Sequence, residues 1–236
     1  MTVPRVLAHR GATAVAPENT VQAFVAARAL GADGVELDVH RTADGGLVLN
    51  HDADARGLGV LAERTEAEIR AARPEIPTLD EALEACAGML VNVEVKNLPG
   101  DADYDPAERV AAGVVELLGR RGLRDDVLVS SFNLESVNRV RALDASIPTG
   151  FLTLVGMDPV DGVDVAHAHG HGAVNPDVRS LAGGAAVATI SRAHELGMTV
   201  NVWTVNDEDE MRRLADAGVD AVITDVPDVA RRVFTA

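Results

Sequence analysis

Gly34-Val-Glu-Leu-Asp-Val-His40 predicts a buried β-strand with two acidic side chains on one face. Side chains at positions i and i+2 of a strand point the same way, so Glu36 and Asp38 share a face, while valine and leucine fill the other. An exposed edge strand with a polar face is the alternative, but the apolar face favours burial. Two buried carboxylates need a positive partner, and a divalent cation is the simplest one.

A second segment, Met89-Leu-Val-Asn-Val-Glu-Val-Lys96, repeats this pattern. Asn92, Glu94 and Lys96 share one face, so Glu94 is a candidate for a third carboxylate ligand. An oxygen-rich site of this kind suits one Mg²⁺ or Ca²⁺ ion better than Zn²⁺. The alternative is a structural ion pair between Glu94 and Lys96. Lys96 is the only lysine among 21 lysine and arginine residues, which suggests a role that arginine could not fill.

Strand and helix patterns alternate along the chain. We expect strands at residues 6–9, 34–40, 89–96, 127–131, 149–154, 173–175, 199–203 and 221–225, and a hairpin turn at 43–46 that leads into a further strand at 47–52. Helical patterns cover 20–30, 65–72, 78–87, 106–121, 134–143, 186–196, 207–217 and 228–234, whereas 156–172 has no clear pattern. This alternation predicts a (β/α)8 barrel that forms a single domain over residues 1–236. A doubly wound open sheet is the alternative.

Polar residues gather at the ends of the predicted strands. These ends carry His9, Asp38, Lys96, Ser131, Asn175, Trp203 and Asp225, whereas the strand starts are mostly apolar or small. In a barrel of this kind the active site lies at the C-terminal ends of the strands. The sequence therefore predicts an active site at that end of the barrel.

Two histidines are candidates for acid–base catalysis. His9 and His51 each follow an apolar strand and lie where a loop begins, and histidine titrates near neutral pH. A structural hydrogen bond is the alternative role for each of them. Arg10 follows His9, and its guanidinium group can bind a phosphate oxygen. We therefore expect the two histidines to act as general acid and general base beside a metal-bound phosphate.

The composition restricts the possible partners. The 236-residue chain has a formal net charge of −16, which disfavours nucleic acid and anionic membranes as partners. No apolar run has the length of a membrane span and no cleavable signal opens the chain, so we expect a cytoplasmic protein. Cys86 is the only cysteine, which excludes an intrachain disulfide and fits a reducing compartment.

An ordered set of motifs resembles the glycerophosphodiester phosphodiesterase family. The motifs are His9-Arg-Gly11, Pro17-Glu-Asn-Thr20, Glu36-Leu-Asp38, His51-Asp52, Glu94-Val-Lys96, Val174-Asn-Pro-Asp177, Trp203-Thr-Val-Asn206 and Gly218-Val-Asp-Ala-Val-Ile-Thr-Asp225-Val-Pro227. They run from His9 to about Pro227 and so cover nearly the whole chain.

The resemblance implies a barrel enzyme that acts on small glycerophosphodiesters of lipid and glycerol metabolism. Such an enzyme hydrolyses its substrate to sn-glycerol 3-phosphate and an alcohol. By position, Glu36, Asp38 and Glu94 match the ligands of the metal ion. His9 and His51 match the acid–base pair.

The resemblance also implies residues that bind and surround the substrate. Arg10 and Lys96 match phosphate contacts, and Trp203 matches a residue that lines the glycerol end of the pocket. Glu18 is expected to orient Arg10 or the histidine before it, and Asn19 is placed with Glu18 in the outer layer of the site.

Two segments depart from the family pattern. Residues 53–59 replace an Arg-Thr-Thr-rich segment, and the subdomain inserted there is short, so the identity of the alcohol stays open. His167-Ala-His-Gly-His171 is not a family motif, and it is either a transition-metal site or, as we expect, a histidine-rich loop or helix end. Asp101-Ala-Asp-Tyr-Asp105 resembles part of a calcium-binding loop, but it lacks the required Gly and the terminal Glu.

Two other functions remain as alternatives. A lysophospholipase D-type enzyme would act on a lipid headgroup and needs an apolar channel at the rim. A non-catalytic barrel that binds a phosphorylated metabolite would not need two histidines. The sequence leaves open the choice of Mg²⁺ or Ca²⁺, which histidine is the acid, whether water or a substrate hydroxyl is the nucleophile, and the oligomeric state.

Overall fold

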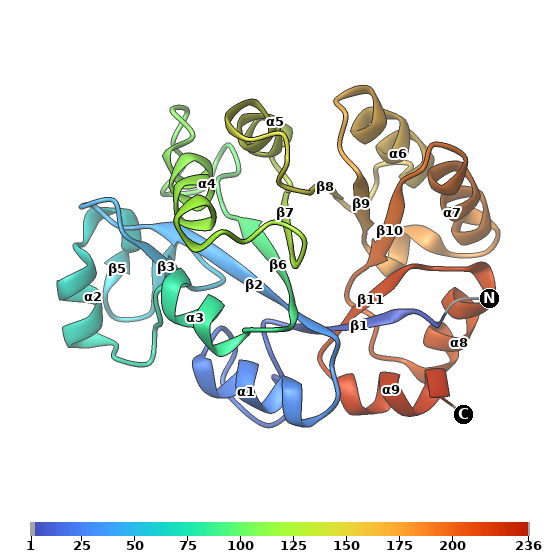
Figure 1. The fold of residues 1–236 in the computed structure, drawn as a ribbon, viewed down its shortest axis with the longest axis horizontal. Coiled ribbons are helices and arrows are strands. Elements are labelled where there is room, and N and C mark those ends of the chain that lie inside the picture. The colour runs from blue at the N-terminus through green and yellow to red at the C-terminus, as the bar shows by residue number, and fades with distance from the viewer. Residues whose placement is uncertain (1–2, 236) are drawn as a thin grey trace.

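A closed barrel of parallel strands forms the centre of the computed structural model, which describes residues 3–235 (Figure 1). Its strands are β1 (Arg5–His9), β2 (Gly34–Arg41), β6 (Leu90–Val95), β7 (Val127–Ser131), β8 (Thr149–Thr153), β9 (Ala173–Pro176), β10 (Thr199–Val202) and β11 (Ala221–Thr224). Each strand pairs in parallel with the next in this order, and β1 pairs with both β2 and β11, which closes the barrel. The predicted (β/α)8 barrel is confirmed, and the open-sheet alternative is wrong.

Helices surround the strands on the outside of the barrel (Figure 1). They are α1 (Val21–Ala29), α3 (Leu79–Ala85), α4 (Arg109–Arg121), α5 (Leu134–Leu143), α6 (Pro159–Ala168), α7 (Ala185–Glu195), α8 (Glu208–Ala217) and α9 (Pro227–Thr235), with the short 3₁₀ turn η2 (Val178–Leu181) before α7. Side chains fix several starts: Thr20 accepts from the N–H of Ala23, and Thr78 forms a capping box with Glu81. Neighbouring helices also contact one another, since Arg28 of α1 donates to the carbonyl of Ala85 in α3 at 3.2 Å and to that of Ala87 beyond it at 2.7 Å.

The predictions for two helical segments differ from the observed helices. The unassigned segment 156–172 contains α6, which begins with Asp158 as N-cap and Pro159 in its first turn. The helix expected from residue 106 begins only at Arg109, because Glu108 has a left-handed backbone (φ 55°) and cannot belong to the helix.

The connection between β2 and β6 is the longest and carries a small subdomain. It contains β3 (Leu47–Leu49), the hairpin of β4 (Asp54–Ala55) and β5 (Gly59–Val60), the turn η1 (Leu61–Glu63) and α2 (Glu66–Ala72). β3 pairs antiparallel with the end of β2. The strand expected at 47–52 ends at Leu49, so His51 lies in a bend beyond the strand and at the rim of the barrel.

The apolar core lies between the strands and the helices. Val35 and Leu37 of β2 are fully buried against Phe24 of α1 and Leu79 of α3. Because complete burial of such a side chain contributes about 1.5–3 kcal/mol, this contact fixes which face of β2 points outward. The acidic face of β2 therefore points into the barrel. Within residues 3–235, no helix combines the length and the apolar character that a membrane crossing requires.

Candidate active site

Three carboxylates meet inside the barrel at the C-terminal part of its strands. Parallel pairing of β2 with β6 places Asp38 beside Glu94, and Glu36 lies two residues earlier on β2. All three are buried, and one carboxylate oxygen from each lies within 4.8 Å of the others. The structure thus brings together the three residues that the sequence singled out as metal ligands.

The charges of this cluster are only partly balanced by protein groups. Burial raises the pKa of Glu36 well above its ordinary range, and the negative charges of Asp38 and Glu94 raise it further. Within residues 3–235, the one hydrogen bond to the Glu36 carboxylate comes from the backbone N–H of Arg10, at 3.1 Å. A buried acid with so little compensation fits a divalent cation bound by oxygen ligands, as Mg²⁺ and Ca²⁺ prefer.

Two basic side chains contact the cluster. The Arg10 Nε lies 3.2 Å from Asp38 Oδ2, and the Lys96 Nζ lies 2.9 Å from Glu94 Oε1 and 3.5 Å from Asp38 Oδ1. Burial alone would raise the pKa of Asp38, but the charges of Lys96 and Arg10 outweigh it and hold that pKa below its ordinary value. Glu94 and Lys96 do form the ion pair that was the structural alternative, yet Glu36 remains outside it.

The outer residues of the site hold these groups in place. Glu18 accepts a hydrogen bond from Arg10 Nη1 at 2.9 Å, so it supports Arg10 and not His9. Asn19 donates to Asp38 Oδ2 at 2.8 Å and accepts from the Asp38 backbone N–H at 3.1 Å. Arg10 adopts a left-handed backbone angle (φ 54°), which is strained for a long side chain, whereas Asn19 has the same angle and asparagine tolerates it. The strain at Arg10 fits a site whose geometry is fixed by its surroundings.

His9 is oriented by an acidic partner from the last strand of the barrel. Its Nδ1 lies 2.7 Å from Oδ1 of Asp225. The Asp225 carboxylate also accepts hydrogen bonds from Thr13, at Oδ1, and from Asn206, at Oδ2. The hydrogen bond with His9 is the main reason why the pKa of Asp225 is lowered. His9 and Trp203 then line a small cavity together with Glu36 and Glu94.

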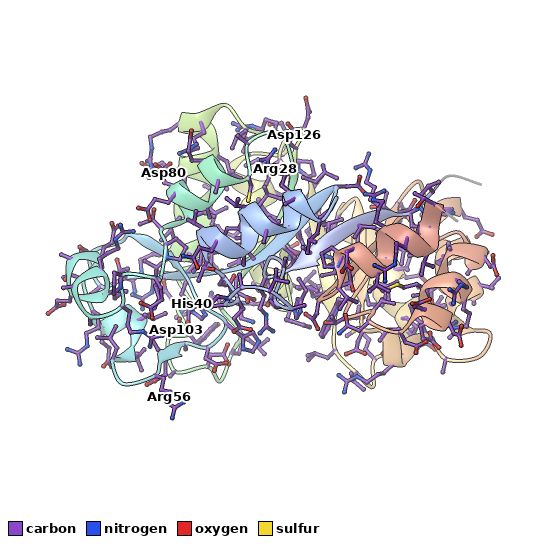
Figure 2. The ribbon with its side chains drawn as sticks, turned by 90° about the horizontal axis from the view of Figure 1, so that it is seen from below. Arg28, His40, Arg56, Asp80, Asp103 and Asp126 are labelled. Carbon is purple, nitrogen blue, oxygen red and sulfur yellow. The ribbon has the colours of Figure 1, made fainter. Side chains whose placement is uncertain are left out.

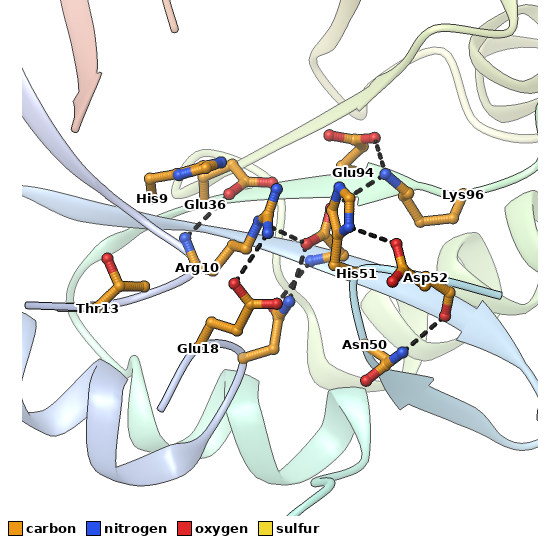
Figure 3. Close-up of polar contacts among 12 residues, drawn as sticks. His9, Arg10, Thr13, Glu18, Glu36, Asn50, His51, Asp52, Glu94 and Lys96 are labelled. Atoms are coloured by element: carbon orange, nitrogen blue, oxygen red, sulfur yellow. Dashed lines mark hydrogen bonds and ion pairs between the residues drawn. The ribbon is translucent and has the colours of Figure 1, made fainter. Parts of the chain in front are cut away.

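His51 lies on another side of the same cluster. Its Nδ1 is 2.7 Å from Oδ1 of Asp52. Burial lowers its pKa, and the attraction of Asp38 offsets this only in part. His51 lines a cavity of about 270 Å³ with Glu94 and Lys96, and apolar side chains form part of its wall: Leu98, Ala102, Phe132 and Leu154. Figure 3 shows Glu36 and Arg10 between the two histidines.

Sequence reasoning gave no role to Asp225 or Asn206, although both lie in motifs quoted above. Asn206 accepts from the backbone N–H of Asp225 at 2.9 Å and so holds the partner of His9. The position of Asp225 at a strand end was the available signal. Its contact with His9 spans 216 residues, so only the closure of the barrel brings the two together.

The histidine-rich segment lies at the end of α6, where two of its rings have side-chain partners. Within residues 3–235, the carboxylates Glu36, Asp38 and Glu94 are the one group of His, Cys, Asp or Glu with metal-ligand spacing. His171 faces the Thr149 hydroxyl at 2.9 Å and His169 faces Asn138 at 3.0 Å, so both rings have structural partners. The interpretation as a helix end is supported and the transition-metal alternative is not.

Comparison with known proteins adds an independent line of evidence. Residues 9–229 match the family model of the glycerophosphoryl diester phosphodiesterase family. The chain is 32% identical to a glycerophosphodiester phosphodiesterase of Caldanaerobacter subterraneus, with 94% of each chain covered, and 30% identical to one of Bacillus subtilis, with 96% of this chain and 85% of that one covered.

Solved structures give the same match at the level of the fold. A phosphodiesterase of Oleispira antarctica, in complex with the product sn-glycerol-3-phosphate, superposes with a TM-score of 0.85 at 27% identity, covering 99% of this chain and 98% of that one. A glycerophosphodiester phosphodiesterase of Thermotoga maritima superposes with a TM-score of 0.84 at 26% identity, covering 99% of both chains.

Proposed function

The chain belongs to the glycerophosphoryl diester phosphodiesterase family and is a phosphodiesterase, and from that premise we propose that it hydrolyses glycerophosphodiesters to sn-glycerol 3-phosphate and an alcohol with the help of one divalent cation. The observation that carries this proposal is the buried carboxylate cluster with a histidine on either side. The product complex of the Oleispira antarctica relative supports the same substrate class.

Glu36, Asp38 and Glu94 would hold the cation. A bound Mg²⁺ or Ca²⁺ supplies positive charge that stabilises the developing negative charge on the phosphoryl oxygens. Arg10 and Lys96 are the protein groups that add to this charge, because both already lie at the edge of the cluster. Burial would lower the pKa of Lys96, but Glu94 and Asp38 raise it, so Lys96 is positively charged when substrate arrives.

His9 and His51 divide the proton transfers between them. One accepts the proton of the nucleophile, which is water or a neighbouring hydroxyl of the substrate, and the other donates a proton to the departing alcohol. Asp225 and Asp52 orient the two rings through Nδ1, which leaves each Nε2 for the substrate. Trp203 contributes an apolar surface beside His9 for the glycerol group.

Alanine variants of the two histidines test this assignment. We expect His9→Ala and His51→Ala each to lower kcat for glycerophosphocholine by about 10²–10⁴-fold, because each removes a positioned acid or base. Release of glycerol 3-phosphate measures the rate. His194→Ala is the matched control, since His194 is also paired with a carboxylate, Asp220, but belongs to α7. Near-normal activity in both site variants would exclude the acid–base pair.

One observation favours a second substrate class, the lysophospholipids. Leu154 lines the cavity next to His51 and is 50% exposed, and Val155 and Met157 behind it are 54% and 37% exposed. Such an apolar edge could contact an acyl chain.

Comparing turnover of lysophosphatidylcholine with that of glycerophosphocholine separates the two substrate classes. We expect glycerophosphocholine to be faster, and the reverse order would establish the lipid headgroup as the preferred substrate.

A further inference from the structure

We propose that His40 and Asp103 act as positioning residues for His51. This inference rests on the proposed function, because it assigns to the pair the task of fixing one of the two proposed acid–base groups. His40 ends the acidic strand segment and Asp103 lies within Asp101–Asp105, but neither residue has a role in the site described above. The contacts of His40 join three separate segments: the end of β2, the bend at His51 and the loop at Asp103.

The His40 ring bridges two loops at the rim of the barrel. Its Nδ1 lies 2.6 Å from Oδ2 of Asp103, and its Nε2 lies 3.4 Å from the backbone carbonyl of His51. Both partners offer oxygen acceptors, so each ring nitrogen faces an acceptor. Figure 2 labels His40 and Asp103 next to each other, in the interior of the part of the chain that carries β2.

Burial makes this bridge costly to break. The side chains of His40 and Asp103 are each 1% exposed. A buried polar group that loses its partner costs about 1–3 kcal/mol, and more when the group is charged. The pair therefore persists only while the loop that carries Asp103 stays against the end of β2.

The bridge adds to the support that His51 receives within its own bend, where the Asn50 side chain donates to the Asp52 carbonyl at 2.7 Å. His51 follows β3, which has only three residues, and its own side chain is paired with the exposed Asp52. Asn50 adds one backbone hydrogen bond to the carbonyl of Asp38, at 3.2 Å. His40 is a buried side chain whose Nε2 faces the His51 carbonyl at 3.4 Å, so we infer that its ring fixes the position of the His51 backbone.

The loop that carries Asp103 is itself well ordered by hydrogen bonds. Asn97 donates to the carbonyl of Asp105 at 3.0 Å and accepts from the Asp105 N–H at 2.7 Å. The Asn97 carbonyl in turn accepts from Asn133 at 2.9 Å. Asp103 thus extends from a rigid loop, which explains how it can act as an anchor for His40 instead of moving with it.

Kinetics of single and double variants test the proposal. Misplacement of a catalytic group by about 1 Å can cost about 10²-fold, so we expect His40→Leu to lower kcat for glycerophosphocholine about 10–100-fold. His40→Gln should restore part of this loss, because its amide can donate to the His51 carbonyl. Added to His51→Ala, His40→Leu should cause little further loss, since it acts through His51. If the losses of kcat from the two single variants multiplied in the double variant, the proposal would be overturned.

A matched control separates positioning from general destabilisation. His171→Leu also removes a buried histidine with a side-chain partner, but His171 lies between α6 and β9 and its partner Thr149 is on β8. We expect it to lower the Tm about as much as His40→Leu does, with kcat unchanged. Equal losses of kcat in His40→Leu and His171→Leu would show that His40 acts only through stability, and the positioning role would be wrong.

Hydrogen exchange gives a readout that does not depend on turnover. His40→Leu should increase deuterium uptake in peptides covering residues 50–53 and 99–105, whereas His171→Leu should not. Unchanged uptake in both peptides would overturn the positioning role even in an active enzyme. If the wild type does not turn over any diester but the uptake changes as expected, the bridge stands and the proposed function fails.

Discussion

Gly11 follows the strained Arg10 and fixes the direction in which that side chain enters the site. Its φ is +87°, and a Cβ at this position would lie 2.5 Å from the Cβ of Ala23 and 2.8 Å from its carbonyl carbon. Gly45 has the same φ of +87° but no atom within 4 Å of such a Cβ. The two glycines therefore separate the cost of backbone strain from the cost of a steric clash.

We expect Gly11→Ala to destabilise the protein more than Gly45→Ala. Both variants incur a strain of about 1 kcal/mol or more, and Gly11→Ala adds an overpacking cost of about 1–3 kcal/mol because α1 must move. Urea unfolding followed by circular dichroism gives the two free energies of unfolding. Equal losses of unfolding free energy in the two variants would show that the loop at Gly11 can move to accommodate the added Cβ.

His171 predicts a pH-dependent contribution to stability. Burial lowers its pKa to about 4 in the folded protein, and the charges of Arg141 and His169 act in the same direction. The pKa in the unfolded chain is about 6.5. Because the folded pKa is the lower one, the unfolded chain binds more protons between these values, and stability is lost as the pH falls from about 6.5 towards 4.

The variant His171→Asn should lack this contribution. The difference in free energy of unfolding between wild type and variant should therefore shrink as the pH is lowered through that window, because only the wild type pays for protonation there. Urea unfolding of both proteins at a series of pH values measures this difference in free energy of unfolding. A difference that is constant with pH would show that His171 is not protonated differently in the two states.

At the scale of elements, the N-terminal caps made several helices predictable. Thr78 accepts from the Glu81 N–H at 3.2 Å, and Glu81 accepts from the Thr78 N–H at 2.9 Å. Thr78→Ala should lower the free energy of unfolding by about 0.5–2 kcal/mol. Thr235→Ala is the control, since its exposed hydroxyl donates only to a carbonyl at a helix end, and its effect should stay within about 0.5 kcal/mol. A Thr78→Ala loss as small as the control would contradict the capping argument.

The strands were predictable because their apolar residues follow a simple pattern. In β2, alternating Val35, Leu37 and Val39 indicated one buried face and placed Glu36 and Asp38 on the other, as the structure has them. Helix α6 was not predictable from periodicity, because glycine and histidine interrupt its apolar pattern. Its N-cap signal, Asp158-Pro159, was present but weak without that pattern.

Partners that lie far apart in the chain could not be predicted. The alternation in β2 and β6 was enough to place three carboxylates together, since adjacent parallel strands keep their register. The pair of His9 with Asp225 depends on the closing contact of β1 with β11, and the pair of His40 with Asp103 joins β2 to the loop that follows β6. Local propensity carries no information on such contacts.

At the scale of the whole molecule, charge is distributed unevenly. The chain has a net charge of −16, yet Arg10 and Lys96 lie together beside the buried carboxylates. An acidic protein repels anions at long range, so binding of a phosphodiester depends on positive charge within the site itself. A divalent cation is the group that would turn the carboxylate cluster from a repulsive into an attractive surface for phosphate.

Glycerol 3-phosphate release from glycerophosphocholine, measured after EDTA treatment and again after addition of Mg²⁺ or Ca²⁺, tests this account most directly. We predict that EDTA abolishes the activity and that one of the two ions restores it. Glu36→Gln, which removes one of the three carboxylates, should need a higher ion concentration for the same recovery. Activity that is unchanged by EDTA in the wild type would contradict the metal site on which the account depends.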